Sequence, residues 1–400
     1  MTKTEAVVHV INGRQKKLVH GHPWIYGNEI ERVEGDPADG ELVEAVDFRG
    51  RFLGRGIYNS HSLLTVRLLT HDGTEVTEEL IRERVKNACR MRKTVLARPG
   101  TDSCRLIYGE ADLLPGVICD RFGGTVVLQI LTLGMEKYTD VIADALMDCE
   151  QTECLYLKND DRIRQKEGMD CFVRVIRGNL PETVIITENG IRMKVDIEGG
   201  QKTGSFLDQK ANHLYVRQFS KDARVLDCFS YSGGFALNAA YAGAREVRAV
   251  DISEGAVRLI GENAALNGLT VEPILANCFD FLREQVRLGE QYDVIILDPP
   301  AFTKAHANME NACRGYKEIA LSAMRLLPAG GILATHSCSY HMPEETFLNT
   351  VYSAAQDLHR TVQLLDLRRQ DMDHPVLAGY PESHYLKSVW LRMLDGPASR

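Results

Sequence analysis

The segment from Arg224 to Ala244, RVLDCFSYSGGFALNAAYAGA, limits the fold more than any other part of the chain. Val225–Cys228 is apolar like a buried parallel strand, Phe229–Gly234 contains two glycines, and Phe235–Ala242 is rich in alanine. This order predicts a strand, a glycine loop and a helix. Such a unit brings backbone N–H groups and the positive end of a helix to the carboxyl edge of a sheet, where nucleotide cofactors bind. An ordinary tight turn would look the same, so the loop alone does not identify a cofactor.

Length and composition limit the class of protein. The chain has 400 residues, and because a single core rarely grows beyond about 250–300 residues, we expect two or three domains. The hydrophobic fraction of 44% and the charged fraction of 26% are typical of a soluble globular protein. No apolar run approaches the roughly 18–20 residues that span a bilayer, and the N-terminal residues lack the apolar core of a signal peptide. We therefore expect a cytoplasmic protein with no membrane partner.

The ten cysteines are scattered, and none forms a Cys-x-x-Cys pair. This spacing predicts reduced thiols rather than a disulfide framework, and it predicts no metal site.

The pattern along the chain predicts three domains. Residues 1–75 alternate short apolar runs with Gly, Pro and Asp, which indicates a small β domain. Residues 76–188 combine a long helix with several strands, as in an α+β domain. The dipeptide Asn189-Gly190 marks a hairpin turn at the start of the last domain, residues 189–400. From Arg224 onward strands and helices alternate, which predicts an α/β fold with a mostly parallel sheet covered by helices on both faces.

The segment Glu78–Arg98 is a predicted helix with seven basic side chains against one acidic side chain between Arg82 and Arg98. The net charge of −8 gives no global sign of nucleic-acid binding, but a local basic patch is compatible with it. A solvated helical face and a surface that follows phosphates both explain this helix. The two interpretations remain open.

Acids end two of the later predicted strands. Asp251 ends the second strand, where a carboxylate can accept hydrogen bonds from both hydroxyls of a ribose, although a helix cap is the common alternative. The fourth strand ends in Asp298-Pro-Pro-Ala-Phe, whose prolines hold the backbone rigid and direct the acid. The GxGxxG motif of dehydrogenases is absent. Together the glycine loop, Asp251 and Asp298-Pro-Pro resemble a class I S-adenosylmethionine-dependent methyltransferase, in which a DPP-like motif closes the reaction pocket.

The fifth strand delivers His336-Ser-Cys338 to the same edge. C5 of a pyrimidine is too poor a nucleophile to take a methyl group directly, but a thiolate that adds to C6 makes C5 reactive. Cys338 is therefore the predicted nucleophile, with a packing role as the alternative. A thiol with a free pKa near 8.5 needs activation, and His336 is expected to point the same way along the strand. Asp298 is predicted to bond the N3 and amino edge of cytosine.

Long strings along nearly the whole chain resemble the PUA-domain-containing, class I S-adenosylmethionine-dependent family that methylates C5 of cytosine in large-subunit (23S) ribosomal RNA. GHPWIYGNEI and FLGRGIYNSHSLLTVRLL are similar to its PUA domain, and RLIYGEADLLPGVICDRFGG is similar to its central domain. The strings GGQKTGSFLDQKANH, VLDCFSYSGGFALNAA, DPPAF and SCSYHM follow in the family's order. The resemblance implies a small RNA-binding β-barrel PUA domain, a central α+β domain and a Rossmann-like methyltransferase domain with a mostly parallel seven-stranded sheet.

The resemblance also implies which residues hold S-adenosylmethionine. They are Asp227, Phe229, Ser230, Tyr231, Ser232, Gly233, Gly234, Asp251, Ile252, Asn277, Cys278 and Asp298, with Lys202, Thr203, Ser205 and Asp208 in a segment near the cofactor. Asn277 replaces the family's usual Asp, and its amide can still bond adenine. Lys210 and His213 stand where the family has arginine, which weakens the case for RNA contacts there. Cys338 matches the family nucleophile, and the absence of a Cys after Asp298-Pro-Pro agrees with a single-cysteine arrangement.

Two other functions are compatible with the same sequence. A related enzyme could methylate a ring or exocyclic nitrogen of RNA, although Ala301 then separates the prolines from Phe302 where amine methylases place the aromatic directly. A non-catalytic RNA-binding factor in ribosome assembly is the second alternative. The expected partner is ribosomal RNA or the assembling large subunit, and a homodimer is left open.

Overall fold

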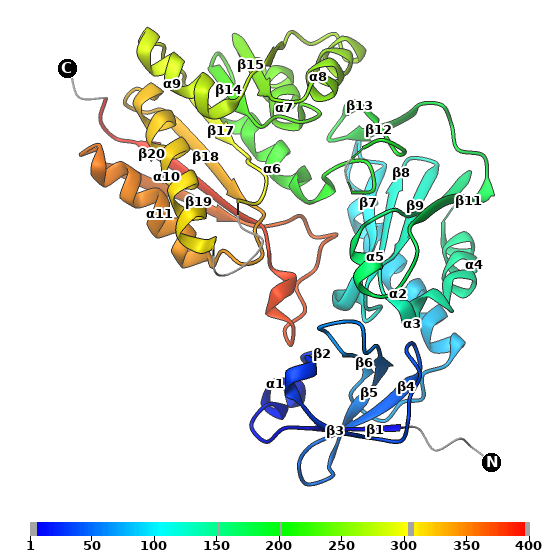
Figure 1. The fold of residues 1–400 in the computed structure, drawn as a ribbon. Coiled ribbons are helices and arrows are strands. Elements are labelled where there is room, and N and C mark those ends of the chain that lie inside the picture. Colours follow the sequence, from blue (N-terminus) through cyan, green and yellow to red (C-terminus); the bar gives the residue numbers. More distant parts are fainter. Residues whose placement is uncertain (1–5, 151, 201, 303–307, 397–400) are drawn as a thin grey trace. The chain divides into compact units, whose positions relative to one another are not determined.

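The computed structural model describes residues 6–150, 152–200, 202–302 and 308–396, and Figure 1 shows its fold. Within these residues the chain forms two compact units. The first comprises Met1–Ile186, Val195–Ser205 and Met372–Ser383, and the second comprises Thr187–Lys194, Phe206–Asp371 and His384–Arg400. Both units are therefore discontinuous in sequence.

A six-stranded sheet forms the N-terminal part of the first unit, with strand order β2-β6-β5-β4-β1-β3. Its elements are β1 (Ala6–Val10), α1 (Gln15–Val19), β2 (Trp24–Ile25), β3 (Ile30–Glu34), β4 (Leu42–Val46), β5 (Phe52–Tyr58) and β6 (Val66–Thr70). A Cβ atom at Gly54 would lie 2.4 Å from the Thr70 carbonyl oxygen, and one at Gly56 would lie 2.4 Å from the Arg67 carbonyl oxygen. Only glycine at these positions allows β5 to approach β6 so closely.

The rest of the first unit is built on a five-stranded sheet of order β11-β10-β9-β8-β7. Its elements are α2 (Glu78–Leu96), β7 (Ser103–Tyr108), β8 (Val117–Phe122), β9 (Thr125–Ile130), α3 (Leu133–Glu136), α4 (Thr139–Cys149), β10 (Cys154–Asn159), α5 (Ile163–Lys166) and β11 (Phe172–Gly178). Helices α2 and α4 contribute apolar side chains to the same core as β7–β10. This arrangement is the α+β segment that the sequence predicts.

The basic side chains of α2 are partly used inside the fold. Arg92 is fully buried and pairs with Asp112 through Nη1 and Nη2, each 2.6 Å from a carboxylate oxygen. Arg84 donates to the carbonyl oxygens of Leu69 and Leu113, both at 2.6 Å. These two arginines stabilise the first unit, so fewer basic groups remain for a phosphate-binding surface than the sequence suggested.

The predicted hairpin turn is confirmed. Strands β12 (Val184–Glu188) and β13 (Ile191–Val195) pair with each other. Asn189 and Gly190 connect them with φ values of 53° and 81°. These left-handed conformations are the ones that an Asn-Gly turn adopts in a two-residue hairpin loop.

The second unit contains a seven-stranded sheet of order β16-β15-β14-β17-β18-β20-β19. The first five strands in this order are parallel, and β20 is antiparallel to both of its neighbours. The strands are β14 (Arg224–Cys228), β15 (Glu246–Asp251), β16 (Glu272–Leu275), β17 (Val294–Leu297), β18 (Ile332–Ser337), β19 (Val362–Arg368) and β20 (Lys387–Met393). The helices are α6 (Lys210–Tyr215), α7 (Gly234–Tyr241), α8 (Glu254–Leu266), α9 (Cys278–Leu288), α10 (Met309–Leu326) and α11 (Glu344–Asp357).

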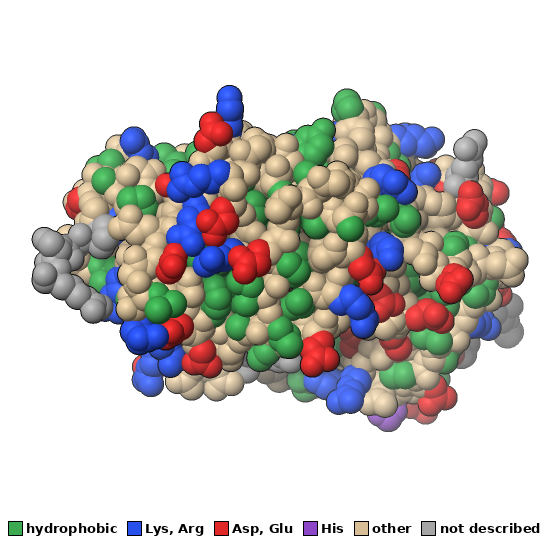
Figure 2. All heavy atoms as spheres, turned by 90° about the horizontal axis from the view of Figure 1, so that it is seen from above, with side chains coloured by type: hydrophobic (Ala, Val, Ile, Leu, Met, Phe, Trp, Pro, Cys, Tyr) green, Lys and Arg blue, Asp and Glu red, His purple; other side chains and the backbone are tan. Residues whose placement is uncertain are grey.

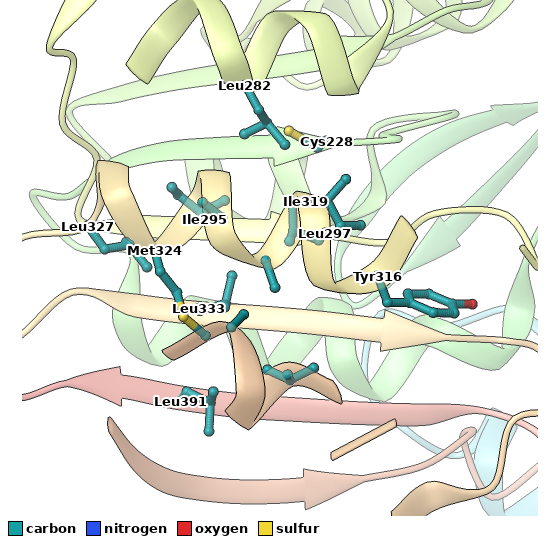
Figure 3. Close-up of a cluster of buried hydrophobic side chains, with 14 of the residues drawn as sticks. Cys228, Leu282, Ile295, Leu297, Tyr316, Ile319, Met324, Leu327, Leu333 and Leu391 are labelled. Atoms are coloured by element: carbon teal, nitrogen blue, oxygen red, sulfur yellow. The ribbon is translucent and has the colours of Figure 1, made fainter. Parts of the chain in front are cut away.

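Helices cover both faces of this sheet, because successive strand residues point to opposite sides. Val225 packs in a core with α7 and α8, whereas its neighbour Leu226 packs in a second core with α9, α10 and α11. Figure 3 shows the second core, in which Tyr316, Ile319 and Met324 of α10 lie over β17 and β18. The predicted Rossmann-like α/β fold is confirmed.

One face of the molecule carries side chains of mixed charge. Figure 2 shows a face on which basic, acidic and hydrophobic side chains are interspersed. None of the helices in the described part of the chain is both long and apolar enough to cross a membrane.

Candidate active site

The glycine loop between β14 and α7 adopts an uncommon backbone conformation. Phe229, Tyr231 and Gly233 have φ values of 64°, 50° and 89°. Left-handed conformations are costly for residues with a Cβ, so the surrounding contacts must hold them. The loop is tied to its neighbours by hydrogen bonds from Ser230 N to Val250 O at 3.1 Å, and from the Asn263 amide to Ser232 O at 3.0 Å.

Asp227, near the end of β14, holds this loop by hydrogen bonds. Its side chain is fully buried, and Oδ2 accepts hydrogen bonds from Ser230 Oγ at 2.5 Å and from Ala236 N at 3.1 Å. Burial raises the pKa of Asp227 to about 7. Through these two hydrogen bonds the carboxyl group links the loop to the first turn of α7. Because Asp227 is buried, it would affect cofactor binding by holding the loop in place.

Gly234 allows the loop to pack against a buried ion pair. A Cβ atom at this position would lie 2.3 Å from Cε1 of His213. Nδ1 of His213 lies 2.6 Å from Oε1 of Glu188. Although burial opposes protonation, the carboxylate raises the pKa of His213 above its ordinary value. The His213 side chain is thus buried and paired with Glu188 inside the second unit.

Lys210 is also buried, at 1% exposure. Its ammonium lies 3.9 Å from Asp371 Oδ2. The two signature positions at which the family resemblance implies arginine, Lys210 and His213, both face acids within the second unit.

Asp251 lies at the carboxyl end of β15 and joins two loops. Its Oδ2 accepts a hydrogen bond from Tyr231 N, and its Oδ1 accepts one from Ser253 N, both at 2.9 Å. The side chain of Ile252, the next residue, is 70% exposed. A carboxylate oxygen has two lone pairs, so each can accept a further bond from a ribose hydroxyl. An exposed apolar side chain beside it offers a surface for an adenine ring.

Asn277 and Cys278 begin α9 at the same edge of the sheet. Asn277 is exposed and caps the helix, since its Oδ1 accepts a hydrogen bond from Phe279 N at 2.9 Å. Cys278 is 3% exposed, and its Sγ accepts a hydrogen bond from Phe229 N at 3.2 Å. The Cys278 thiol therefore supports the glycine loop from inside the core, while Asn277 remains accessible to a ligand.

Asp298 follows β17 and accepts the last hydrogen bond in a chain of three between side chains. Gln209 Nε2 donates to Asp298 Oδ2 at 3.0 Å, Asn212 Nδ2 donates to Gln209 Oε1 at 2.7 Å, and Arg368 Nε donates to Asn212 Oδ1 at 3.0 Å. This chain fixes the Gln209 amide so that its NH₂ group faces Asp298. Burial and then the nearby Asp208 carboxylate raise the pKa of Asp298 to about 7.

Asp208 is held by two hydrogen bonds from residues near the C-terminal end of the chain, Tyr385 and Asp371. Tyr385 donates a short hydrogen bond from its hydroxyl to Asp208 Oδ2, and Asp371 N donates to Asp208 O at 2.9 Å. Asp208 belongs to the second unit, whereas Lys202, Thr203 and Ser205 belong to the first.

Cys338 follows β18, which is the direct neighbour of β17 in the sheet. Its side chain is half-buried. Ser337 Oγ donates to the Tyr316 hydroxyl at 2.9 Å. Burial raises the pKa of Tyr316 to about 12, and the ionised forms of Cys338 and Asp298 would both raise it as well. Cys338 and Asp298 thus follow neighbouring strands at one edge of the sheet, and the sequence predicts that these strands are neighbours.

His336 is not placed to be a base. It is fully buried, its ring packs 4.9 Å from that of Phe235, and neither ring nitrogen has a hydrogen-bond partner among the described residues. Burial lowers the pKa of His336 to about 3, so the imidazole is neutral at physiological pH. This excludes the imidazolium form as an activator of Cys338.

Lys202, Thr203 and Ser205 belong to the first unit. Thr203 is fully buried and donates from Oγ1 to Asp120 Oδ2 at 2.5 Å, and Asp120 also pairs with Arg105 at 2.7 Å. Their expected position near the cofactor stays a prediction.

Sequence reasoning missed Gln209 and Tyr316. Gln209 lies within the GGQKTGSFLDQKANH string, but nothing in that string indicates that its partner is 89 positions away. Tyr316 lies on the apolar face of an amphipathic helix, where a core role is the default interpretation. Among the described residues, no group of three or more His, Cys, Asp or Glu side chains is placed to bind a metal.

The fold and this site define a class. A PUA-like domain model matches residues 8–71, and an S-adenosylmethionine-dependent methyltransferase model matches residues 124–373. The second match covers more than half of the chain, so the chain belongs to the S-adenosylmethionine-dependent methyltransferase family and its cofactor is S-adenosylmethionine. The exposed acceptors and apolar surface around Asp251 fit that cofactor.

Particular relatives narrow the comparison. The chain is 41% identical over 387 residues to "Ribosomal RNA large subunit methyltransferase I" of Klebsiella pneumoniae (strain 342), a match that covers 96% of this chain and 97% of the relative. It is also 41% identical over 390 residues to the protein of the same name from Aeromonas salmonicida (strain A449), covering 96% and 98%.

Solved structures agree on the fold. A methyltransferase structure complexed with SAH matches with a TM-score of 0.84 at 22% identity, covering 96% of this chain and 99% of that one. A protein from Streptococcus mutans described as a SAM-dependent methyltransferase matches with a TM-score of 0.83 at 21% identity, again covering 96% and 99%. The overall fold is thus shared along nearly the whole chain.

Proposed function

We propose that this methyltransferase transfers a methyl group to C5 of a cytosine in large-subunit ribosomal RNA, through a covalent bond between Cys338 and C6 of the base. The observation that carries the proposal is the position of Cys338 and Asp298, which follow neighbouring parallel strands and both influence the Tyr316 hydroxyl when ionised. The name of the two relatives supports ribosomal RNA of the large subunit as the substrate.

Cys338 supplies the nucleophile. Its thiolate adds to C6, and the electron pair of the C5–C6 bond moves so that C5 becomes nucleophilic. S-Adenosylmethionine supplies an electrophilic methyl group when bound. Loss of the C5 proton and elimination of Cys338 then restore the aromatic base. Because both ring faces must be reached, the cytosine has to lie in a loop or be flipped out of its stack.

Asp298 orients and polarises the base. With a pKa raised to about 7, a large fraction of Asp298 carries a proton at neutral pH. That proton can be shared with N3 of cytosine, which makes C6 more electrophilic. Gln209, held by Asn212, keeps Asp298 Oδ2 in place so that the other oxygen is directed to the base.

The cofactor is proposed to lie across the loop edge of β14 and β15. Asp251 accepts the ribose hydroxyls, Ile252 and Asn277 face the adenine, and the loop from Phe229 to Gly234 contacts the amino-acid part. Asp227 and Cys278 hold that loop through their side chains. We also propose domain boundaries at residues 75 and 188, with the PUA-like domain contributing to RNA binding, and we leave the homodimer as a proposal.

Replacing Asp251 with alanine is expected to weaken binding of S-adenosylhomocysteine about 10- to 100-fold, because a hydrogen bond to a charged group contributes about 1.5–3 kcal/mol. Asp251→Asn should lose less, since an amide oxygen can still accept from Tyr231 N. Isothermal titration calorimetry measures both affinities. Glu284→Ala, which removes an exposed acid of α9, is the control. Unchanged affinity in Asp251→Ala would remove Asp251 from the cofactor site.

The alternatives differ in their need for a thiol. A nitrogen acceptor carries its own lone pair, so an enzyme that methylates a ring or exocyclic nitrogen of RNA would not need Cys338. A non-catalytic assembly factor would show no turnover with any RNA. Cys338 beside Asp298 favours carbon methylation over both.

The proposal is tested by mapping modified nucleotides in ribosomal RNA by mass spectrometry, from cells with and without the gene. One 5-methylcytosine of the large-subunit RNA should disappear in the deletion strain and return with the wild-type gene. Loss of an N-methylated nucleotide instead would support the nitrogen alternative. An unchanged modification pattern would contradict both enzymatic functions.

A further inference from the structure

A buried lysine lies beside the strand end that carries Cys338. Strands β18 and β20 pair antiparallel, and Ser337 stands opposite Lys387 in their register. Lys387 is 3% exposed, and its ammonium donates to Ser339 O and to Tyr385 O, both at 2.6 Å. The first of these acceptors belongs to the residue that directly follows Cys338. Lys387 thus holds the backbone on the C-terminal side of the proposed nucleophile.

The charge of Lys387 also reaches the thiol. Burial lowers the pKa of Lys387 to about 8, while the Glu344 carboxylate and a thiolate at Cys338 would raise it. The amine is therefore still mostly protonated at pH 7, although it is buried. A buried ammonium is expensive unless negative groups compensate it, and a thiolate at Cys338 would provide that compensation.

Other titratable groups face this pair from the neighbouring elements. The Glu344 carboxylate at the start of α11 raises the pKa of Lys387. Burial lowers the pKa of His384, and the positive charges of Lys387 and Arg369 lower it further, whereas Glu344 raises it. The Tyr316 hydroxyl of α10 lies on the Cys338 side, and its raised pKa keeps it neutral. His336 is neutral as well.

We propose that Lys387 is a positioning residue that stabilises Cys338 as a thiolate and fixes the Cys338–Ser339 backbone for attack on C6. The inference rests on the proposed role of Cys338 as nucleophile. The Cys338 thiol gives its proton to water, and the ammonium of Lys387 stays protonated, so the ion pair forms without a further reagent. Nearby cations lower thiol pKa values in this way in other reactive cysteines.

The test measures the reactivity of Cys338 without RNA or S-adenosylmethionine. Iodoacetamide alkylation of the Cys338 peptide is followed by mass spectrometry between pH 5.5 and pH 10, because only the thiolate reacts. The Lys387→Met variant should shift the midpoint upward by at least about one unit, which makes alkylation at pH 7 about ten-fold slower. Lys387→Arg, which keeps the charge, should restore the profile to within about three-fold of wild type.

Lys387→Gln and Lys317→Gln serve as controls. Lys387→Gln keeps hydrogen-bond donors without the charge, so it should behave like Lys387→Met if charge matters. Lys317 pairs with Asp357 at the surface, and its replacement should leave the profile unchanged. Thermal unfolding and calorimetry with S-adenosylhomocysteine confirm that each variant is folded.

Identical alkylation profiles for wild type, Lys387→Met and Lys387→Gln would overturn the inference. A shift in Lys387→Gln without rescue by Lys387→Arg would also overturn it, because geometry alone would then be responsible. Neither result depends on cytosine methylation. The ribosomal RNA map tests the proposed methylation, and the alkylation assay tests the effect of Lys387 on Cys338. Either result can be negative while the other is positive.

Discussion

The Cys338→Ala variant is expected to lose methyl transfer to ribosomal RNA by at least about 10³-fold, because no other group in the C5 mechanism can form the bond to C6. Binding of S-adenosylhomocysteine should stay within about two-fold of wild type, since Cys338 lies beyond the strand that carries Asp298 rather than at the loop edge of β14 and β15. A tritium-release assay from cytosine C5 and calorimetry measure the two quantities.

Cys149→Ala is the matched control, because Cys149 is another half-buried cysteine and ends α4 in the first unit, whereas Cys338 belongs to the second unit. It should keep nearly full activity. RNA that contains 5-fluorocytosine adds a direct test, since fluorine at C5 prevents the final elimination and should trap a covalent complex with wild type but not with Cys338→Ala. A Cys338→Ala enzyme of normal activity would point to nitrogen methylation.

The Asp298→Asn variant is expected to reduce the methylation rate about 10²- to 10⁴-fold, the usual contribution of a positioned proton donor or acceptor. Burial, followed by the Asp208 carboxylate, raises the pKa of Asp298 to about 7. The proton available for N3 of cytosine is therefore present below pH 7 and is lost as the pH rises through that value. The wild-type rate should show an alkaline limb with a midpoint near pH 7, and this limb should be missing in Asp298→Asn.

Asp293→Asn is the control for this profile. Asp293 lies at the opposite end of the same strand, where its Oδ2 accepts a hydrogen bond from Arg224 N at 2.8 Å. Its replacement should change thermal stability more than the pH dependence of methylation. An alkaline limb that persists in Asp298→Asn would assign the ionisation to another group and would contradict the proposed proton sharing with N3.

Much of the fold follows from local patterns. The alternation of strands and helices after Arg224 predicts a mostly parallel sheet, because each helix must return the chain to the same edge. Asn189-Gly190 predicts a hairpin turn that the structure confirms. Continuous apolar residues in the strands predict a sheet that is buried on both faces. Val225 and Leu226 confirm this, because they pack in different cores on opposite faces of the sheet. These features depend on neighbouring residues, so the sequence contains the information directly.

The candidate site is less accessible to sequence reasoning. The strands that precede Cys338 and Asp298 are neighbours as predicted, but the partners of these groups come from remote segments. Gln209 meets Asp298 from 89 positions away, and Lys387 donates to Ser339 O from 48 positions away. Periodicity describes the burial of a side chain and not the identity of its partner. The role expected of His336 illustrates this, because only its surroundings indicate that the ring is neutral.

By itself the sequence determined which chemical groups stand at the carboxyl ends of the parallel strands: the glycine loop, Asp251, Asp298 and Cys338. It also determined the family, through long strings in a fixed order. Only the tertiary structure decided the protonation of Asp298 and the contacts that orient these groups. The antiparallel pairing of β20 with β18 brings Lys387 to the backbone beside Cys338, and burial raises the pKa of Asp298 to about 7. Both effects depend on packing between distant segments, which local sequence patterns do not encode.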